Sequence, residues 1–207
     1  MSELINEIAG YYSRKLGEHG ATPRGVDWNG LGGQTLRFAQ LTQLIEADQP
    51  YSLNDLGCGY GALFQELQQS EVYVDYCGID VSSCMIQAAK ARTCGIPNVN
   101  FVIADTPDRI ADYGVASGIF NVRQTRTNDE WECHMLEVIN ALNLTSRKGF
   151  AFNCLCPCSD PDFEKSHLYY TDPQWLVDVC RDRYSKDVTL LTDYGLFEFT
   201  ILVRKRL

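Results

Sequence analysis

Residues 54–61 read NDLGCGYG, and this stretch decides how the rest of the chain is interpreted. Gly57, Gly59 and Gly61 stand at alternate positions after a short apolar run that ends near the acidic Asp55. A glycine-rich turn between a strand and a helix lets a ligand approach the backbone closely and presents free N–H groups at the start of the helix. The stretch therefore indicates a site for a nucleotide-like ligand, although a plain tight turn has a similar composition.

From residue 51 onward the hydrophobic pattern alternates between short strands and amphipathic helices. We expect strands near 51–57, 72–81, 98–105, 113–122 and 149–156, and helices near 62–70, 82–92, 128–146 and 172–184. The helix near 128–146 is expected to be capped by Asn128 or Asp129. Residues 186–205 hold two apolar runs joined around DYG with no room for a helix, which predicts a hairpin. Together these patterns predict an α/β protein with a mostly parallel sheet and an antiparallel strand at its end.

The segment before residue 51 has a different, helical pattern. Helical spacing of apolar residues covers the first 18 residues and recurs near 33–47. We therefore predict a single domain over 1–207, with an N-terminal helical cap at 1–48 and a core at 49–207. A polar, proline-punctuated insertion at about 157–173 is expected to form a lid over the site.

Composition and charge narrow the class of partner. The chain has 18 Lys and Arg against 27 Asp and Glu, a net charge of -9, which argues against binding along a nucleic-acid backbone. The first 20 residues show no basic region followed by an apolar run, and no stretch approaches the roughly 18 apolar residues of a spanning helix. We expect a soluble cytoplasmic protein with a small-molecule substrate and no membrane partner; the sequence leaves the oligomeric state open.

Nine cysteines are many for a chain of this length. Cys154, Cys156 and Cys158 are spaced by two, which would place their thiols on one face of a strand. Structural zinc sites more often use two separate pairs of ligands, so we expect buried thiols that act as small hydrophobic side chains, and no metal.

A second acidic residue follows the glycines at the distance that one β-α-β unit requires. Asp80 lies 19 residues after Gly61, at the end of the second expected strand, where a carboxylate can bind ribose hydroxyls. A dinucleotide site is the main alternative, because Gly57, Gly59 and Ala62 also satisfy G-x-G-x-x-[GA]. The extra acid and glycine, the short chain and the closing hairpin all count against that alternative.

These residues resemble the class I S-adenosylmethionine-dependent methyltransferases of the small-molecule type. DLGCGYG matches the family's D/E-x-G-x-G-x-G motif, GIDVSSCMI its ribose-binding acid and following helix, and FVIAD its third-strand acid. The resemblance covers roughly residues 34–206. It implies a three-layer α-β-α sandwich whose seven-stranded sheet has the order 3-2-1-4-5-7-6, with strand 7 antiparallel.

The resemblance also implies roles for individual residues toward S-adenosylmethionine and its product S-adenosylhomocysteine. Asp55 would help to hold the methionine end, Asp80 the ribose hydroxyls and Asp105 the adenine amino group. Arg37, in QTLRF, is the candidate for the cofactor carboxylate. The other residues expected to bind the cofactor are Gly57, Gly59, Gly61, Val81, Met85, Thr106 and Phe120.

Ligands of this fold bind over the carboxyl ends of the strands, so the segments that cover this edge supply candidates for substrate binding. These candidates are Tyr12, Trp28, Asn121, Arg123 and Tyr170, and the candidates for a catalytic role are His134, His167 and Tyr169. A base is needed only where the nucleophile holds a proton that water cannot take. Structural roles for the histidines and core packing for Trp28, Val81 and Met85 are the alternatives.

The predicted activity is methyl transfer to an oxygen or nitrogen atom of a small-molecule metabolite. Two alternatives stay open: a protein or RNA methyltransferase, and a non-catalytic methyltransferase-like subunit. A protein or RNA methyltransferase would need a recognition surface, such as a basic groove or an Asn-Pro-Pro-Tyr-type amide-binding motif after the fourth strand; the chain has IFNVRQ there, which weakens the amide-binding form of this alternative. The presence of the residues expected to bind the cofactor counts against a non-catalytic subunit; these residues are Asp55, Gly57, Gly59, Asp80 and Asp105.

Overall fold

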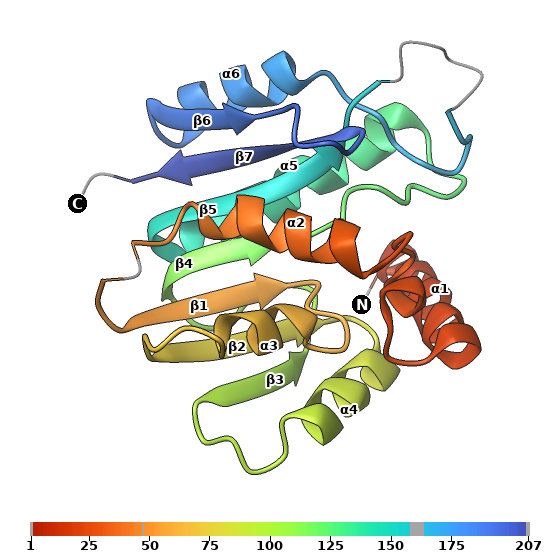
Figure 1. The fold of residues 1–207 in the computed structure, drawn as a ribbon. Helices are drawn as coiled ribbons and strands as arrows, with labels where there is room; N and C mark the ends of the chain where they lie inside the picture. Colours follow the sequence, from red (N-terminus) through yellow and green to blue (C-terminus); the bar gives the residue numbers. More distant parts are fainter. Residues whose placement is uncertain (1, 47, 158–163, 206–207) are drawn as a thin grey trace.

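A computed structural model describes residues 2–46, 48–157 and 164–205 of the chain (Figure 1). Its seven-stranded sheet has the order β3-β2-β1-β4-β5-β7-β6. The strands are β1 (Tyr51–Leu56), β2 (Val74–Asp80), β3 (Val99–Ile103), β4 (Ala111–Ala116), β5 (Ser146–Leu155), β6 (Asp187–Leu191) and β7 (Glu198–Arg204). The helices are α1 (Glu3–His19), the short 3-10 helix η1 (Pro23–Val26), α2 (Leu31–Thr42), α3 (Ala62–Leu67), α4 (Ser83–Arg92), α5 (Asn128–Leu144) and α6 (Pro173–Arg183).

The pairing of the strands confirms the predicted topology. Strands β1 to β5 pair in parallel, whereas β7 runs antiparallel to both β5 and β6. The predicted hairpin is therefore β6 and β7, and it closes one end of the sheet (Figure 1). Parallel strands need long crossovers, and helices lie between β1 and β2, between β2 and β3, and between β4 and β5. No described helix lies between β3 and β4, or between the antiparallel β6 and β7.

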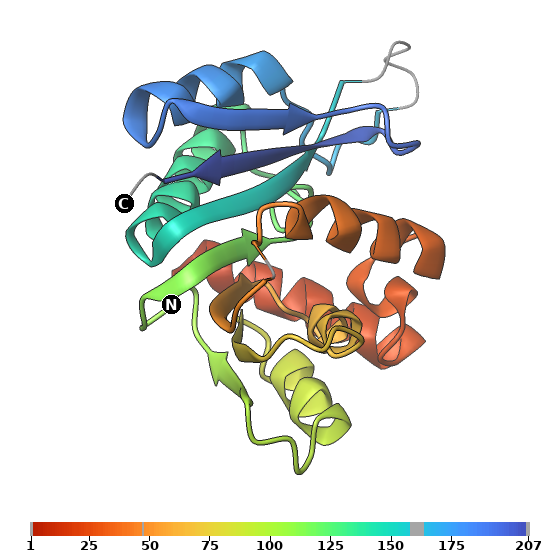
Figure 2. The ribbon, with the colours of Figure 1, turned by 60° about the vertical axis from the view of Figure 1, so that its left-hand side comes forward.

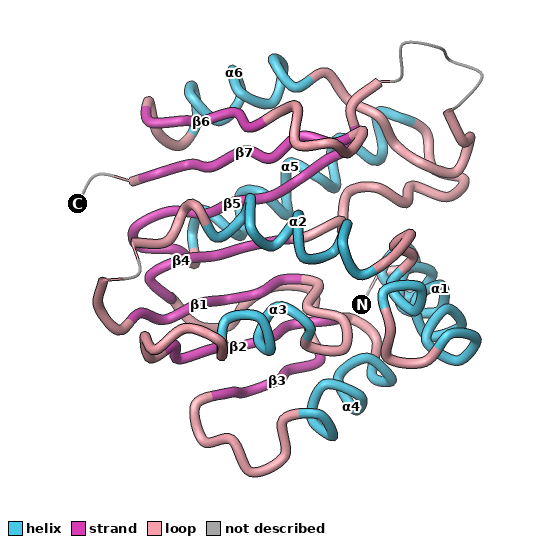
Figure 3. The backbone as a smooth tube through the Cα atoms, in the orientation of Figure 1, coloured by secondary structure: helices cyan, strands magenta, loops and turns pink. Residues whose placement is uncertain are grey.

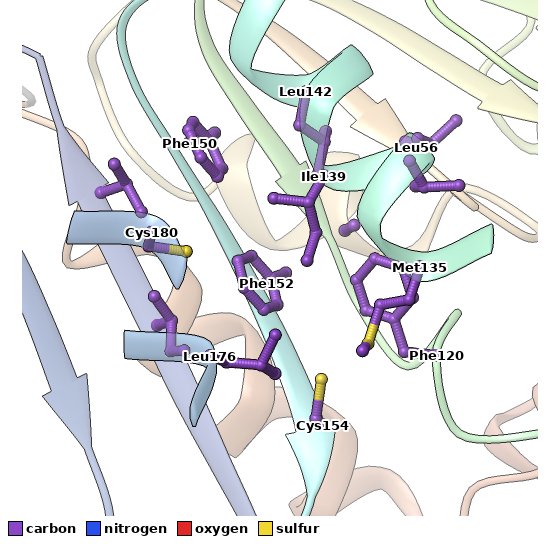
Figure 4. Close-up of a cluster of buried hydrophobic side chains, with 14 of the residues drawn as sticks. Leu56, Phe120, Met135, Ile139, Leu142, Phe150, Phe152, Cys154, Leu176 and Cys180 are labelled. Carbon is purple, nitrogen blue, oxygen red and sulfur yellow. The ribbon is translucent and has the colours of Figure 1, made fainter. Parts of the chain in front are cut away.

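Helices cover both faces of the sheet, so the sheet lies between two hydrophobic cores. On one face α2, α3 and α4 contribute Phe38, Leu41, Phe64 and Ile86 to a cluster with side chains of the strands. On the other face α5 and α6 pack against the sheet, and Figure 2 shows α2 and α5 on opposite sides. Figure 4 shows this second core, which includes Met135, Ile139, Phe150, Phe152 and Leu176.

The expectation of buried thiols holds for only part of the described cysteines. Cys58, Cys77, Cys154 and Cys180 are buried and Cys156 is half-buried, whereas Cys84, Cys94 and Cys133 are exposed, so for these three the expectation is wrong. Cys154 and Cys180 are fully buried in the second core (Figure 4), and Cys156 packs against the same core. Burial raises the pKa of the Cys154 thiol, with the carboxylate of Glu198 adding to the effect. Cys158 lies outside the described residues, and among the described ones no three His, Cys, Asp or Glu side chains are grouped as metal ligands would be.

The structure corrects the predicted end of the fourth strand. Residues 113–122 were expected to form it, but β4 covers Ala111–Ala116 and the chain continues to α5 without regular structure (Figure 3). Gly118 explains the early end, because its φ of 73° is left-handed and incompatible with a strand. Its N–H donates to Asn153 Oδ1 of β5 over 2.6 Å instead of joining a strand ladder.

The start of α5 is a second correction. Neither Asn128 nor Asp129 caps the helix; Thr127 does, since its side chain accepts from the Glu130 N–H while the Glu130 carboxylate accepts from the Thr127 N–H. This reciprocal pair is a capping box, which satisfies two N–H groups that the helix itself leaves free. The sequence shows T-x-x-E at these positions, so the signal was present but was assigned one residue too late.

The carboxyl ends of the parallel strands meet at one edge of the sheet, and α1 lies over this edge (Figures 1 and 3). Helix α1 contacts η1 and α4, and its residues Leu4 and Ile8 pack against the second core. The described part of the predicted lid returns to the same edge, where its backbone pairs with Val122 and Leu155. No described helix is long and apolar enough to cross a membrane.

Candidate functional site

The glycine turn connects β1 to α3 at this edge. Gly57 and Gly59 have φ values of 76° and 53°, a left-handed conformation that favours glycine. A Cβ at Gly57 would lie 2.1 Å from Ile119 Cγ2, and one at Gly59 would lie 2.9 Å from Val26 Cγ1. The N–H groups of Gly57 and Cys58 both donate to Ile79 O of β2, over 2.7 and 3.0 Å, which fixes the turn against the neighbouring strand. A side chain at either glycine would therefore collide with Ile119 or Val26 beside the turn.

Asp80, at the end of β2, is held against this turn by backbone donors. Its Oδ2 accepts from the Gly59 N–H over 2.9 Å, and its Oδ1 accepts from the Ser82 N–H over 2.8 Å. Burial raises the pKa of Asp80 to about 6, and the backbone N–H groups of Ser82, Gly59 and Val81 oppose that rise. A carboxylate oxygen has further lone pairs, so both oxygens can still accept a hydrogen bond from a hydroxyl group of a ligand.

Asp55, at the end of β1, is the second buried acid. Its Oδ2 accepts a short hydrogen bond from the hydroxyl of Tyr76, which β2 places directly beside it. Burial raises the pKa of Asp55 to about 7; the Tyr76 hydroxyl opposes this rise, and the nearby Asp80 carboxylate adds to it. Two acids with raised pKa values at the base of one cavity are a typical sign of a functional site.

A cavity, here called the glycine-loop cavity, opens between the turn and α1. It encloses about 980 Å³ of space, including the open solvent at its mouth. Ten of the predicted site residues line it: Tyr12, Trp28, Asp55, Gly57, Gly59, Asp80, Val81, Met85, Asp105 and His134. The side-chain oxygen of Ser117 also lines it, is buried, and has no hydrogen-bond partner among the described residues, so a bound ligand would satisfy it.

Four residues predicted to bind the cofactor do not line this cavity. Gly61 caps α3 and faces Phe101, since a Cβ there would lie 3.1 Å from that ring. Phe120 is buried against Phe152 in the second core, and Thr106 hydrogen-bonds to Asp105 at 3.4 Å. The fourth is Arg37, which is described below.

Helix α1 supplies a wall of the cavity, as expected of the N-terminal helical cap with Tyr12. Ile5, Ile8 and Tyr12 of this helix line the cavity, as do Gln34 and Phe38 of α2. A hydrogen bond of 2.9 Å between Ser13 Oγ and Ser82 Oγ joins α1 to the cap of α4, beside Asp80. The sequence analysis did not single out Ile5, Ile8, Gln34 and Phe38 as lining residues.

A second depression, here called the outer hollow, adjoins the glycine-loop cavity. Tyr12, Val26, Trp28 and Gly118 line both, so the two spaces share a wall. The predicted residues Asn121, His167 and Tyr170 also line the outer hollow, together with Asp27, Lys165, Phe197 and Glu198, which sequence reasoning missed. The loop after β4 and the described part of the insertion thus meet as expected, with the Tyr169 N–H donating to Asn121 O over 2.9 Å.

Two further predicted residues lie beside the outer hollow rather than in its lining. The guanidinium of Arg123 donates to the carbonyl oxygens of Leu168 and Arg126. The Tyr169 side chain is buried, and its hydroxyl donates to Glu132 Oε1 of α5 over 2.8 Å. Burial raises the pKa of Tyr169 well above its ordinary value.

Arg37 forms a buried ion pair that links α2 to the start of β7. Its Nε donates to Glu198 Oε2 over 2.7 Å, and its Nη2 donates to Glu198 Oε1. Its guanidinium also lies over the Trp28 ring, 3.7 Å from the ring centre. Both charged side chains line the outer hollow, so Arg37 braces Trp28 between the two spaces.

Asp27 follows η1 and ties this turn to α1. Its two oxygens accept from the hydroxyl of Tyr11 over 2.5 Å and from Lys15 Nζ over 2.7 Å. Burial alone would raise the pKa of Asp27, but the hydrogen bonds from Lys15 and Tyr11 outweigh it and the pKa is lowered. Asp27 therefore keeps its negative charge at the rim of the outer hollow near neutral pH.

His134 and His167, the two predicted bases, lie in different places. His134 of α5 lines the glycine-loop cavity, and burial lowers the pKa of its imidazole, opposed by the charges of Glu137 and Asp105. His167 is exposed and lines the outer hollow, where its charge would interact with Asp27.

Known proteins resemble this chain in sequence and in fold. A family profile described as "Methyltransferase domain" matches residues 54–143. The Mycobacterium tuberculosis protein named "Putative methyltransferase Rv1506c" is 52% identical over 163 residues, which are 79% of this chain and 98% of that protein.

Solved structures with low sequence identity share the fold. A complex of DhpI with SAH superposes with a TM-score of 0.65 at 18% identity, covering 99% of this chain and 98% of that one. The N-methyltransferase NodS of Bradyrhizobium japonicum, in complex with S-adenosyl-L-homocysteine, gives a TM-score of 0.65 at 14% identity and covers 95% of this chain and 97% of that one.

Proposed function

This chain belongs to the class I S-adenosylmethionine-dependent methyltransferases, and from that premise we propose that it methylates an oxygen or nitrogen atom of a small-molecule metabolite. The observation that carries this proposal is the shared wall of the two spaces. A cofactor in the glycine-loop cavity would reach the outer hollow past Tyr12, Val26, Trp28 and Gly118. The outer hollow combines aromatic side chains with polar and charged groups that can orient a small molecule.

The residues of the glycine-loop cavity fit S-adenosylmethionine. Gly57 and Gly59 let Ile119 and Val26 pack closely against the turn that lines the cavity, and Ser117 offers a buried oxygen without a partner among the described residues. We assign the ribose hydroxyls to Asp80 and the methionine end to Asp55. The adenine ring would lie among Val81, Met85, Asp105, His134 and Val138, which line the same cavity. Asp105 and His134 interact electrostatically there.

The chemistry asks the protein mainly to align groups. S-adenosylmethionine supplies an activated methyl carbon, so the chain has to orient the acceptor atom toward it and exclude water. Trp28, held by Arg37, and Tyr12 of α1 stand where they can do both. Where the acceptor carries a proton, His167 is the better placed of the two predicted bases, because it lines the outer hollow.

Thermal unfolding with S-adenosylhomocysteine, with NAD and with buffer alone tests the cofactor assignment. A ligand at about 100 times its dissociation constant adds roughly 2.7 kcal/mol. That gain should raise the Tm of a chain of this size by roughly 5–10 °C. The Asp80→Ala variant should lose most of this rise, because it removes both acceptors for the ribose. A rise with NAD and none with S-adenosylhomocysteine would refute the proposal, and an undiminished rise in the variant would refute the role of Asp80.

We also propose a cytoplasmic location, in line with the acidic composition and the nine cysteines, which suit a reducing compartment.

A further inference from the structure

We propose that the methyl acceptor is a primary or secondary amine on an aromatic or apolar body, and that Asn121 Oδ1 binds its N–H. This inference rests on the proposed function and narrows it to a class of substrate. Three features of the outer hollow carry it: an unsatisfied acceptor, two carboxylates with unused lone pairs, and aromatic walls.

The unsatisfied acceptor is the side chain of Asn121. This residue is only 6% exposed and lines the outer hollow, yet its Oδ1 has no hydrogen-bond partner among the described residues. Its backbone is fixed on both sides, because its N–H donates to Gly118 O and its carbonyl accepts from Tyr169 N. An unpaired buried acceptor costs about 1–3 kcal/mol, so a ligand that donates to Oδ1 recovers this energy.

The charged groups in the hollow favour a donor over an acceptor. Asp27 and Glu198 present carboxylates there, and both retain lone pairs beyond those used by their protein partners. The buried cation, Arg37, already donates from Nε and Nη2 to Glu198. Lys165 and His167 are exposed, so water competes with a ligand for the hydrogen bonds that these side chains donate. A carboxylate head group would therefore find Arg37 already paired with Glu198 and the other two cationic side chains open to water.

The walls suit an aromatic or apolar body that carries a cationic amine. Tyr12, Trp28, Tyr170 and Phe197 line the hollow, and Phe197 is 75% exposed at its mouth. Aromatic faces attract ammonium groups as well as apolar rings, by about 0.5–2 kcal/mol for a cation.

Asn121 would also orient the nucleophilic nitrogen of the acceptor toward the methyl group. The nitrogen must lose any extra proton to solvent, on the exposed His167 side, before it can react. Its lone pair then forms the new bond to the methyl carbon, the carbon–sulfur bond breaks with its electron pair left on sulfur, and a proton leaves the methylated nitrogen to solvent. An N–H held by Asn121 Oδ1 keeps the lone pair turned away from the protein and toward the methyl group.

Binding of three matched probes to the full chain saturated with S-adenosylhomocysteine tests this inference by calorimetry. The probes 2-phenylethylamine, 2-phenylethanol and phenylacetate share the ring and differ in the head group. We expect the amine to bind most tightly, by at least about tenfold over phenylacetate, as a hydrogen bond to a charged donor implies. Asn121→Leu should abolish this preference, whereas Asn121→Asp, which keeps an acceptor, should retain it.

Asn140→Leu, at an exposed position on α5, is the matched control and should behave as the unchanged protein. Asn121→Ala removes the same acceptor without adding volume and serves if the leucine variant does not fold. The inference is overturned if phenylacetate binds as well as the amine, if none of the three probes binds, or if both the leucine and alanine variants keep the preference. Failure of the proposed function is separate, since it would show as no binding of S-adenosylhomocysteine by the unchanged protein.

Discussion

Asp55 and Asp80 have raised pKa values because both carboxyl groups are buried at the base of the glycine-loop cavity. Burial is the largest cause in both cases, and hydrogen bonds from Tyr76 and from backbone N–H groups oppose it only in part. A carboxyl group in such a place stabilises the fold in its protonated form and destabilises it when ionised. The positively charged amino group of S-adenosylmethionine at Asp55, and the ribose hydroxyls at Asp80, would favour the ionised forms.

The titration of Asp55 predicts a pH dependence of stability. The pKa of Asp55 is raised from 3.8 to about 7, so its contribution is present below pH 4 and is lost as the pH rises toward 7. Asp55→Asn keeps an acceptor for the Tyr76 hydroxyl but does not ionise. We therefore expect the variant to gain stability over the unchanged protein as the pH rises from 4 to 8, by up to about 4 kcal/mol. Urea unfolding of both proteins across this range measures the difference, and a constant difference would contradict the assignment.

Sequence reasoning succeeded for residues whose place follows from the chain's own periodicity. Asp80 and Asp105 follow β2 and β3, and both line the glycine-loop cavity as the motif implied. It could not foresee the pairing of Arg37, because Glu198 lies 161 positions further along the chain. The role of Arg37 toward the cofactor carboxylate thus stays a prediction, with a buried ion pair as its rival.

At the scale of elements, the pair of Arg37 and Glu198 connects α2 to β7 across the face of the sheet. Removal of one partner would leave the other charge buried without compensation, which costs about 3–5 kcal/mol. Glu198→Ala should therefore lower the Tm by roughly 6–20 °C. The double variant Arg37→Met with Glu198→Ala should recover part of this loss, because no charge then remains buried.

Calorimetric binding of S-adenosylhomocysteine separates this structural role from a direct role in binding. If Glu198 is the main partner of Arg37, Arg37→Met should lower the stability of the protein and should weaken the binding of S-adenosylhomocysteine only slightly. A large loss of affinity with unchanged Tm would instead favour direct binding of the cofactor carboxylate by Arg37.

The elements themselves were largely predictable, because apolar periodicity sets their type and capping residues set their ends. The two errors have local causes: the left-handed Gly118 ends β4 early, and Thr127 caps α5 in place of its neighbours. Both lie in the loop that also carries Asn121, so the part of the fold least evident from the sequence is the part that shapes the outer hollow.

At the scale of the molecule, the order of the strands brings distant segments to one edge of the sheet. Helix α1, the loop after β4, the insertion after β5 and the turn before β7 all contribute to the outer hollow. The sequence predicted that α1, the loop after β4 and the insertion after β5 would gather there, since the carboxyl ends of parallel strands share an edge, but not the turn before β7. It could not predict which side chains face each other across the hollow, because those contacts depend on packing between segments far apart in the chain.

Transfer of a labelled methyl group tests the central claim most directly. The protein is incubated with S-adenosylmethionine labelled in its methyl group and with a cell extract divided by dialysis into small molecules and macromolecules, with Asp80→Ala as the control. We predict that label enters the dialysable fraction and that the control loses this transfer. Label confined to the retained protein and RNA, or no transfer to either fraction, would contradict a small-molecule methyltransferase.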